Sequence, residues 1–576
     1  MTRSSRVTAV VLAGLLTACA SPPGNQPDDV APNARPRESL ADTVRLLEQS
    51  SFGPTPQAVD RVRRQGFVRY LDEQFRLSTS RMPELPPVDS NADKQCGPAS
   101  DATPAVRACR RENYSQFLVQ TRFFQNALNQ PDQLRQRVAF ALGQVFVVSA
   151  RKNNRAYAMA HYQQLLLDNA FGTYRNLLEA VTLSPQMGQY LDMVNNARLD
   201  PQRGVPPNEN FAREVLQLFS VGLVRLNPDG SPQRGADGKP LPTYGATEVA
   251  EFARAFTGWT YPSAGTASGA STATATATVP SAPAPAQPNR RNPAYFDGRM
   301  VPVPGLHDAG PKTLLNGQRI PGSTDPRVDL AAALDNIAAH PNVGPFIGRR
   351  LIQHLTTSNP SPAYVERVAR TFADNGRGMR GDLQAVVRAI LLDAEARGDT
   401  PRDPQFGKLR EPVLYVTGVM RSLGAQSDGV DLIGQSAGME QNVFAAPTVF
   451  NFFPPDYELA GSLQRAPELA IVDSHTSLKR AEFAWRLIFG RPVPPDAMLP
   501  GATGTRLSLS EWEPLAAQPA ALVDTLDTLL LHGRLPAAAR HAVLQAVQAV
   551  PEKDSAQRVK TAAYLLVAGP HYQLQR

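Results

Sequence analysis

Hydrophobic residues return every three or four positions along most of this chain, the spacing that places them on one face of an α-helix. Between residues 38 and 77 the pattern is interrupted once, at the turn-forming pair Gly53-Pro54. Strand-like alternation is scarce, so we expect a mainly α fold with few or no strands. Further helices are predicted over residues 133–148, 161–182, 210–222, 247–259, 329–339, 344–355, 361–374 and 381–396.

Signals at the ends of these segments support the helical pattern. Ser361 and Pro362 precede the run YVERVARTFADNG, which gives a helix a capping hydroxyl and a first-turn proline and ends it at Asn375-Gly376. We expect the helices to build one large multi-helix domain over residues 38–576, or two lobes of such a domain joined near residue 262.

Two stretches lack the large apolar residues that a folded core needs. Residues 19–37 are rich in proline and polar residues, which is typical of a disordered tether. Residues 262–293 form a Ser/Thr/Ala/Pro-rich stretch of low complexity. Because aromatic segments flank this second stretch on both sides, we interpret it as an insertion into the helical domain rather than as a domain boundary.

The first residues carry the three parts of a bacterial lipoprotein signal peptide. Two arginines precede an apolar run over residues 7–16, which is shorter than the roughly 20 residues of a membrane-spanning helix. The sequence LTAC resembles a lipobox, so residues 1–18 are predicted to be removed and Cys19 to be lipidated. The alternative is an ordinary secretory peptide. Both predict export, and Ala20 favours a lipid anchor in the outer membrane that faces the periplasm.

Export places the other two cysteines in an oxidising compartment. Cys96 and Cys109 lie close together in a polar segment, which predicts a local disulfide, with two free thiols as the alternative. Their spacing matches neither the paired cysteines of a zinc site nor a haem attachment motif.

The charge and the motif content exclude the familiar functional classes. The formal net charge of +7 is spread along the chain rather than clustered, so we expect a mixed solvated surface and no nucleic-acid binding. The sequence has no HExxH, P-loop, dinucleotide-binding or EF-hand motif. It therefore identifies no metal and no cofactor.

The segment PPNENFAREVLQLFSVG places charges on a helix that its apolar residues predict to be largely buried. Glu209 and Arg213 are four residues apart and can pair, whereas Glu214 projects elsewhere and needs a second partner. The helix TEVAEFARAFTGW repeats this theme with Glu248, Glu251 and Arg254. These charges indicate either acid/base or metal-binding groups in a cleft, or an internal salt-bridge network that fixes helix packing.

Other candidate groups are weaker. His307, Asp308 and Lys312 lie within one loop, where a histidine beside an aspartate can act as a base, bind a metal or simply stabilise a turn. We expect His354 to be a structural histidine on an apolar helix. Ser436 lies in a G-x-S-x-G pattern, but the preceding residues make a poor strand, so we do not expect a nucleophile elbow there.

Several segments together resemble one family. In chain order they are RLLEQSSFGPT, LSPQMGQYLD, PNENFAREVLQLFSVGL, YGATEVAEFARAFTGW, HDAGPKTLLNG, the long helical stretch from Pro345, GKLREPVL and NVFAAPTVFNFFPPDYE. They resemble the bacterial domain-of-unknown-function family numbered 1800, a group of large exported proteins, from about residue 40 to residue 575. The resemblance implies a predominantly helical fold and export, and it implies no known reaction. Members are often encoded beside exported sulfatase-like proteins of the family numbered 1501, which suggests a partner of that kind.

Three functional hypotheses follow from the sequence. The first is an envelope accessory or binding protein that acts with an exported partner, for example on a polysaccharide. The second is a periplasmic hydrolase or metal-assisted enzyme built from Glu209, Arg213, Glu214 and the His307–Lys312 loop. The third is a structural lipoprotein of the envelope. The enzyme hypothesis predicts that the two groups of charged residues converge at a cleft, and the sequence alone leaves open whether the protein is an enzyme.

Overall fold

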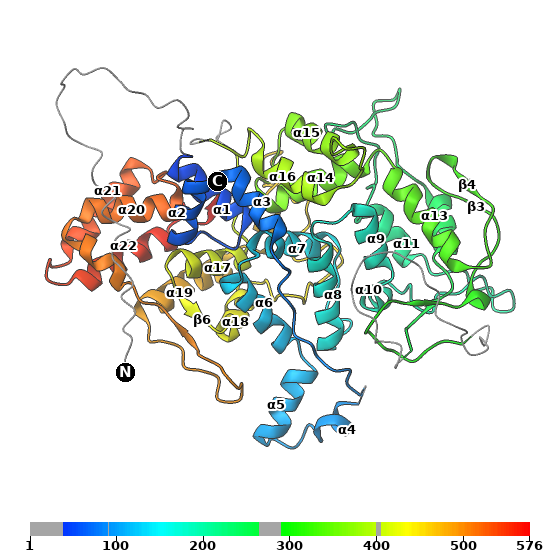
Figure 1. Cartoon of the computed structure of the whole chain (residues 1–576), viewed down its shortest axis with the longest axis horizontal. Helices are drawn as coiled ribbons and strands as arrows, with labels where there is room; N and C mark the ends of the chain where they lie inside the picture. The colour runs from blue at the N-terminus through cyan, green and yellow to red at the C-terminus, as the bar shows by residue number, and fades with distance from the viewer. Residues whose placement is uncertain (1–37, 90, 264–289, 399–404) are drawn as a thin grey trace. The chain divides into compact units, whose positions relative to one another are not determined.

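Helices account for nearly all the regular structure of this computed structural model, so the predicted mainly α fold is confirmed (Figure 1). The structure describes residues 38–89, 91–263, 290–398 and 405–576. The lipidation site Cys19, the signal peptide and the tether lie outside the described residues, as does most of the insertion. The helices are α1 Leu40–Ser50, α2 Pro56–Gln65, α3 Phe67–Arg76, α4 Ala92–Cys96, α5 Pro104–Asn113, α6 Phe117–Asn129, α7 Gln133–Val145, α8 Ala156–Asn169, α9 Tyr174–Thr182, α10 Pro185–Tyr190, α11 Asn210–Gln217, α12 Ala246–Ala255, α13 Pro326–Ala339, α14 Val343–Leu355, α15 Pro362–Ala373, α16 Leu383–Leu392, α17 Pro412–Ser422, α18 Val430–Gly438, α19 Ser474–Phe489, α20 Pro519–Leu531, α21 Ala537–Ala549 and α22 Ser555–Ala568.

The strands of the described part are two residues long and form antiparallel pairs. Short 3₁₀ helices complete the regular structure. The pairs are β1 Trp259–Thr260 with β2 Val301–Pro302, β3 Lys312–Thr313 with β4 Arg319–Ile320, β5 Lys408–Leu409 with β8 Leu574–Gln575, and β6 Gln426–Ser427 with β7 Thr505–Arg506. The 3₁₀ helices are η2 Pro304–Leu306, η3 Leu315–Gly317, η4 Pro467–Ile471 and η5 Ser510–Ala517.

Some predicted boundaries were wrong because local turn chemistry ends helices that the apolar pattern alone would continue. The predicted helix 161–182 is two helices, α8 and α9, and the Thr173 hydroxyl caps the second by accepting a hydrogen bond from the Asn176 backbone N–H at 3.3 Å. The predicted helix 247–259 ends at Ala255, and Gly258 follows with a φ of 83° beside His307. The Ser361 cap is confirmed, because its hydroxyl accepts from the Tyr364 backbone N–H at 3.1 Å.

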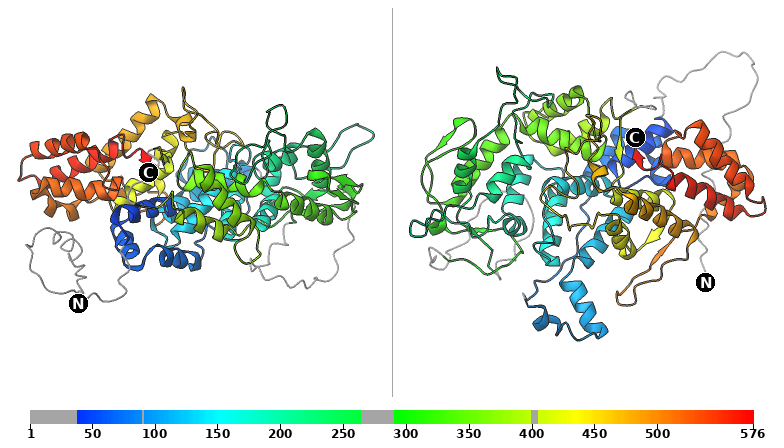
Figure 2. Two further views of the ribbon diagram at one scale, coloured as in Figure 1. Left: turned by 90° about the horizontal axis from the view of Figure 1, so that it is seen from above. Right: turned by 180° about the vertical axis from the view of Figure 1, so that it is seen from behind.

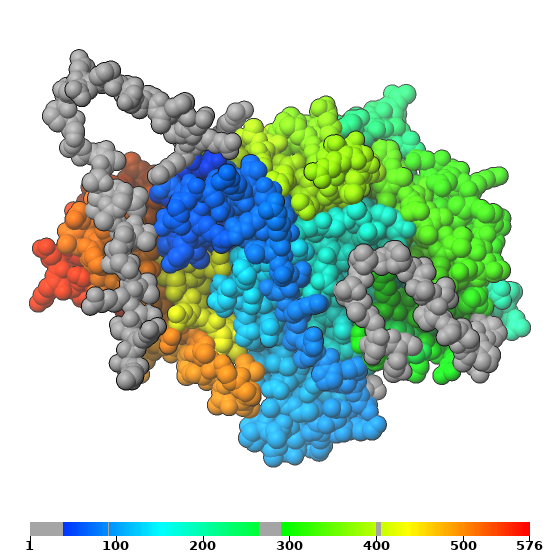
Figure 3. Space-filling view, viewed as in Figure 1, coloured from blue at the N-terminus to red at the C-terminus, as the bar shows by residue number. Residues whose placement is uncertain are grey.

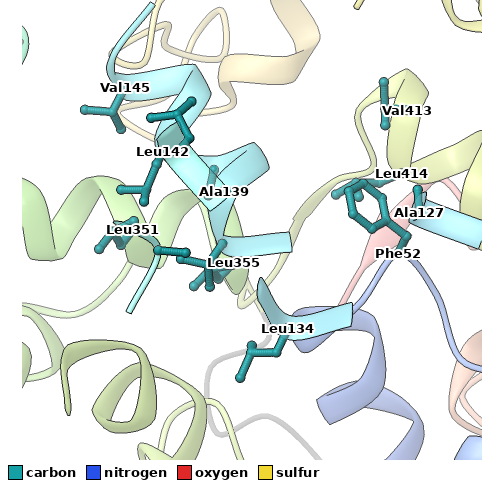
Figure 4. Packing of buried hydrophobic residues seen from close by; sticks show 14 of the residues in the cluster. Phe52, Ala127, Leu134, Ala139, Leu142, Val145, Leu351, Leu355, Val413 and Leu414 are labelled. Atoms are coloured by element: carbon teal, nitrogen blue, oxygen red, sulfur yellow. The ribbon is translucent and has the colours of Figure 1, made fainter. Parts of the chain in front are cut away.

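The apolar faces of the helices meet in one continuous core. Residues 38–576 form one compact unit, and α7 contacts α1, α3, α6, α8 and α14 within it. Figure 4 shows Leu142 and Val145 of α7 near Leu351 and Leu355 of α14. The C-terminal helices α20, α21 and α22 pack against one another, and α20 also contacts α1 (Figure 2). Together these contacts hold both ends of the described chain on one body.

A disulfide links two small helices at the surface. Cys96 of α4 and Cys109 of α5 are bonded, with their Cα atoms 5.6 Å apart, so the predicted pairing is confirmed. Figure 3 shows this segment in blue at the lower edge of the molecule.

Buried charges join the two ends of the described chain. Glu48 of α1 accepts from Arg410 at 2.7 Å and contacts the ring of His532 at 2.8 Å, and all three side chains are nearly inaccessible to solvent. Arg45 Nε donates to the backbone oxygen of Arg576 at 3.0 Å. Removing one member of such a buried pair typically costs about 3–5 kcal/mol, because the remaining charge loses its partner.

Three buried histidines make the fold sensitive to acid. Burial, together with Arg225 and Arg380, lowers the pKa of His340 to about 4. Burial also lowers the pKa of His354 well below its ordinary value and lowers that of His532. Each histidine therefore takes up a proton more readily when the chain unfolds.

We predict that the free energy of unfolding falls as the pH is lowered from about 6.5, the pKa of an unfolded histidine, toward 4. A histidine whose pKa is lower in the folded protein stabilises the fold fully at pH values above its unfolded pKa. This contribution is lost as the pH falls toward the folded-state pKa. The variant His340→Asn should lose less stability across this window than the wild type. Urea unfolding at pH 7, 6 and 5 measures the difference, and equal slopes for the two proteins would contradict the assignment.

Candidate functional site

The first charged segment predicted from the sequence forms a surface ion pair rather than a buried one. Glu209 and Arg213 contact each other at 2.8 Å, but their side chains are 43% and 50% exposed. The apolar residues Phe211 and Val215 of α11 point into the core instead. The expectation that this helix buries its charges therefore fails for this pair, and such an exposed pair contributes little stability, about 0–1 kcal/mol.

Glu214 lies on the other side of α11 and has no cation within ion-pair distance in the described part of the chain. Its Oε2 atom is buried and accepts no hydrogen bond. Burial raises the pKa of Glu214, against a smaller lowering effect of Arg213. Glu214 in turn raises the pKa of Tyr190 and of Tyr244, in addition to the effect of burial on each, so these tyrosines lie nearby.

The His307 loop forms a second, separate charge network that is closed to solvent. Lys312 Nζ contacts the Asp329 carboxylate at 2.6 Å, and His307 Nε2 contacts the same carboxylate at 3.1 Å. Lys312 Nζ also donates to the backbone oxygen of Gly310 at 2.8 Å. The backbone oxygen of Asp308 is its third acceptor, at 2.5 Å. A buried lysine with three acceptors is fully satisfied, which is typical of a structural role.

Asp308 and the charged residues of α12 extend this network. Arg254 donates two hydrogen bonds to Asp308, both at 2.9 Å, and a third to Glu251 at 2.8 Å. Although burial opposes it, this pairing lowers the pKa of Asp308. Glu248 instead accepts from the backbone N–H of Gly245 at the start of α12. The charged residues of α12 are thus arranged as a salt-bridge network, the second of the two alternatives that the sequence offered.

The structure does not join the two groups of candidate residues. Within the residues that it describes, no hydrogen bond or ion pair links Glu209, Arg213 or Glu214 to His307, Asp308 or Lys312. A catalytic role for them stays a prediction from the sequence. Ser436 is fully buried inside α18 and donates to the Ile433 backbone oxygen at 3.4 Å, so this serine is not on a strand-to-helix elbow.

A pocket that the sequence analysis did not single out lies where α7, α14 and the segment 449–468 meet. Its polar lining comes from Gln144 of α7, from Arg350, Gln353 and His354 of α14, and from Asn451 and Glu468. The volume is about 40 Å³, which accommodates a few water molecules or one polar group of a larger ligand. We call this site the Glu468 pocket.

Buried ion pairs fix the floor of the Glu468 pocket. Lys408 Nζ contacts Glu468 Oε1 at 2.9 Å and Glu411 at 3.8 Å, and all three side chains are at most 3% exposed. Gln441 donates to the second oxygen of Glu411 at 2.6 Å. These contacts leave Glu468 Oε2 as a buried oxygen without a hydrogen-bond partner in the described chain.

Hydrogen bonds connect the buried ion pairs to the amides that line the pocket. Gln144 donates to Glu411 at 3.4 Å and accepts from Asn451 at 2.9 Å. Asn451 has a φ of 67°, the left-handed conformation that asparagine adopts more easily than most residues. The Gln144 amide is therefore held by Glu411 on one side and by Asn451, a second lining residue, on the other.

Burial determines the protonation states in the pocket. It raises the pKa of Glu468, with a smaller opposing effect from Lys408 and a further increase from Glu411. The lowered pKa of His354 keeps the imidazole neutral, which agrees with the expected structural histidine, although its ring also lines the pocket. The amides of Gln144, Gln353 and Asn451 both donate and accept hydrogen bonds, and the Arg350 guanidinium adds a cation to the lining.

Exposed apolar side chains lie on the segment that forms one wall of the pocket. Phe450, which lines the pocket, is 43% exposed. Tyr457, Leu459 and Leu463 follow on a hairpin-like loop closed by a bridge between Glu458 and Arg465, and Leu463 is 91% exposed. Phe450 therefore places an exposed aromatic ring at this polar pocket.

The sequence contained one signal for this pocket. The segment NVFAAPTVFNFFPPDYE is rich in aromatic residues and proline, yet lacks the spacing of a helix or strand. Phe444 and Asn451 within it both have positive φ. An aromatic segment without periodicity indicates a wall built by loop residues, but nothing in the sequence pairs it with Gln144 or Lys408.

The described residues contain no group of three or more His, Cys, Asp or Glu side chains placed to hold a metal ion. In the same part of the chain, no helix combines the length and the apolar character needed to cross a membrane.

Comparisons with known proteins place the chain in a family. Neither the curated proteins nor the solved structures include a match to this chain. The family model described as "Protein of unknown function (DUF1800)" matches residues 45–574, which is nearly the whole chain and includes every residue of the Glu468 pocket. This chain therefore belongs to the DUF1800 family of proteins of unknown function.

Proposed function

We propose that this protein is an exported lipoprotein of the cell envelope that binds a polysaccharide at the Glu468 pocket. The observation that carries the proposal is the unpartnered Oε2 atom of Glu468, which is buried beside fixed amide groups. Buried polar atoms are almost always hydrogen-bonded in native proteins, so this oxygen needs a partner from outside the chain.

The chemistry of the lining favours a hydroxyl group as that partner. Gln144, Gln353 and Asn451 carry amides, which both donate and accept, and a hydroxyl group does the same. Glu468 adds an acceptor, because its buried Oε2 atom has no hydrogen-bond partner in the described chain. A sugar supplies several hydroxyl groups at fixed spacing, with an apolar ring face that fits an exposed aromatic residue such as Phe450.

The size of the pocket favours a polymer over a small enclosed ligand. Pockets for drug-sized molecules are typically about 300–1,000 Å³ and bury most of the ligand. A space of about 40 Å³ receives one projecting group, and the rest of the ligand must lie across the surface near Phe450. A long chain at the surface of the protein meets this requirement.

Hydrolysis is the second candidate function, and Glu468 favours it because a buried carboxyl with a raised pKa can act as a general acid. Glycoside hydrolysis ordinarily needs two carboxyl groups on either side of the bond. Glu411 is completely buried behind Gln144 and does not line the pocket. Among the described residues that line the pocket, Glu468 is the one carboxylate, and binding is therefore the better-supported function.

The location in the envelope rests on the sequence. Arginines, a short apolar run and Cys19 form the lipoprotein signal, and the Cys96–Cys109 disulfide agrees with an oxidising compartment. We place the anchor in the outer membrane, facing the periplasm. An exported sulfatase-like protein is the partner that the family association suggests, and such an enzyme would act on the same class of ligand.

The binding proposal predicts that wild-type protein cosediments with at least one polymer from a panel of peptidoglycan sacculi, a neutral glucan and a polyuronate. Phe450→Ala and Asn451→Gly should each weaken this binding about tenfold, corresponding to about 1.4 kcal/mol. Glycine keeps the positive φ of residue 451 without strain, so the second variant removes only the amide. Cosedimentation at increasing polymer concentration gives the affinities.

The matched control is Leu478→Ala, which removes an exposed apolar side chain from α19, outside the pocket. It should bind like the wild type. Equal binding by all the variants, or no binding of the wild type to any polymer in the panel, would refute the proposal. Release of reducing sugar by the wild type and not by Glu468→Gln would favour the hydrolase instead.

The lipoprotein assignment predicts that Cys19→Ser moves the protein from the membrane fraction to the soluble fraction of cells, because no other lipid attachment site is expected. Immunoblotting of the separated fractions measures this shift. The double variant Cys96→Ser/Cys109→Ser removes the disulfide and should stay with the membrane. If Cys19→Ser sediments with the membrane as the wild type does, the anchor is not at this residue.

A further inference from the structure

A second pocket lies between the C-terminal half of α19, the segment that follows it, and β7. Its volume is about 240 Å³, larger than that of the Glu468 pocket. It is separate from the Glu468 pocket, since the two share no lining residue. Figure 1 shows α19 beside β6, whose partner strand β7 supplies one wall.

The charged residues of this second pocket are mostly cations. Arg486, Arg491, Arg506 and Lys560 line it, and Asp431 is the one carboxylate of the lining. The formal charge of the lining is therefore +3. Cations that line one pocket repel one another, and a bound anion reduces this repulsion.

Two of these cations are already bonded within the protein. Arg486 donates to both oxygens of Asp431, at 2.8 and 2.7 Å, so its positive charge balances the negative charge of this carboxylate. Arg506 donates to the Gln426 side chain at 2.8 Å, which directs its guanidinium without neutralising it.

The other two cations have no such partner. In the residues that the structure describes, no carboxylate lies within ion-pair distance of Arg491 or Lys560, and neither side chain donates a hydrogen bond. Lys560 comes from α22, which packs along α19, so residues far apart in sequence direct positive charge to one place. The end of α19 beside them carries only a partial negative charge, about half of an elementary charge, and cannot balance the pocket.

We propose that this second pocket is an oxyanion site that binds the phosphate or sulfate group of a ligand. Arginine forms paired hydrogen bonds with the oxygens of such groups, and lysine adds a point charge. Arg491, Arg506 and Lys560 supply these donors, and the Asp431–Arg486 pair fixes one wall. The anion can be free, or it can be part of a phospholipid headgroup. The proposal does not depend on polysaccharide binding at the Glu468 pocket.

Calorimetric titration of the full-length protein with inorganic phosphate, inorganic sulfate and glycerophosphoglycerol tests the site. The last compound is the headgroup of an anionic phospholipid without its acyl chains. We expect saturable binding of at least one of the three, and weaker binding at higher sodium chloride concentration because the interaction is electrostatic. The double variant Arg491→Gln/Lys560→Gln should weaken the binding at least tenfold.

Arg540→Gln is the matched control, because Arg540 is an exposed arginine outside the pocket that pairs with Asp524. It should bind as the wild type does. Thermal unfolding shows whether each variant is folded, and the two single variants, each expected to weaken binding about threefold, keep the test available if the double variant does not fold.

Preference for glycerophosphoglycerol identifies a lipid headgroup as the ligand, and preference for inorganic phosphate or sulfate identifies a free or terminal anion. Both results support the site. Absence of saturable binding at millimolar concentrations, or equal binding by the double variant, overturns it. Loss of polysaccharide binding in Phe450→Ala has no bearing on this result, so the two proposals fail independently.

Discussion

The ammonium group of Lys408 is the contact on which the Glu468 pocket depends. It lies between Glu468 and Glu411 in the interior of the protein and is inaccessible to solvent. Without Lys408, two buried carboxylates would face each other, and burial and repulsion would both oppose their charges. Glu411 in turn accepts hydrogen bonds from Gln144 and Gln441, so the same ion pairs help to position the Gln144 amide, which lines the pocket. The lysine lies on β5, whose pairing with β8 brings the C-terminal residues against the core.

The sequence predicted the class of fold well and the site poorly, for physical reasons. Helix type follows from apolar spacing and capping residues, which are local, so the cap at Ser361 and most helices were predicted correctly. Glu209 and Arg213 were expected to be buried, but α11 has only eight residues, and this pair lies on its solvent-exposed side. The Glu468 pocket combines residues from positions 144 to 468, and local periodicity cannot indicate which distant residues become neighbours.

Buried charge has two different uses in this protein. The Lys312–Asp329–His307 group is closed on all sides and stabilises the packing of α12 and α13 against the loop between them. The Lys408 group is similarly buried but leaves one carboxylate oxygen unpartnered at a pocket. Both ring nitrogens of His307 and the Lys312 ammonium have hydrogen-bond partners within the protein. The unpartnered oxygen of Glu468 is therefore the difference between a structural network and a candidate binding site.

The most direct test of this account is a crystal structure of the protein with an oligosaccharide fragment of the polysaccharide that it retains. We predict that a sugar hydroxyl lies within hydrogen-bonding distance of Glu468 Oε2 and that a sugar ring packs against Phe450. An oligosaccharide bound elsewhere, with the oxygen of Glu468 still without a partner, would contradict it.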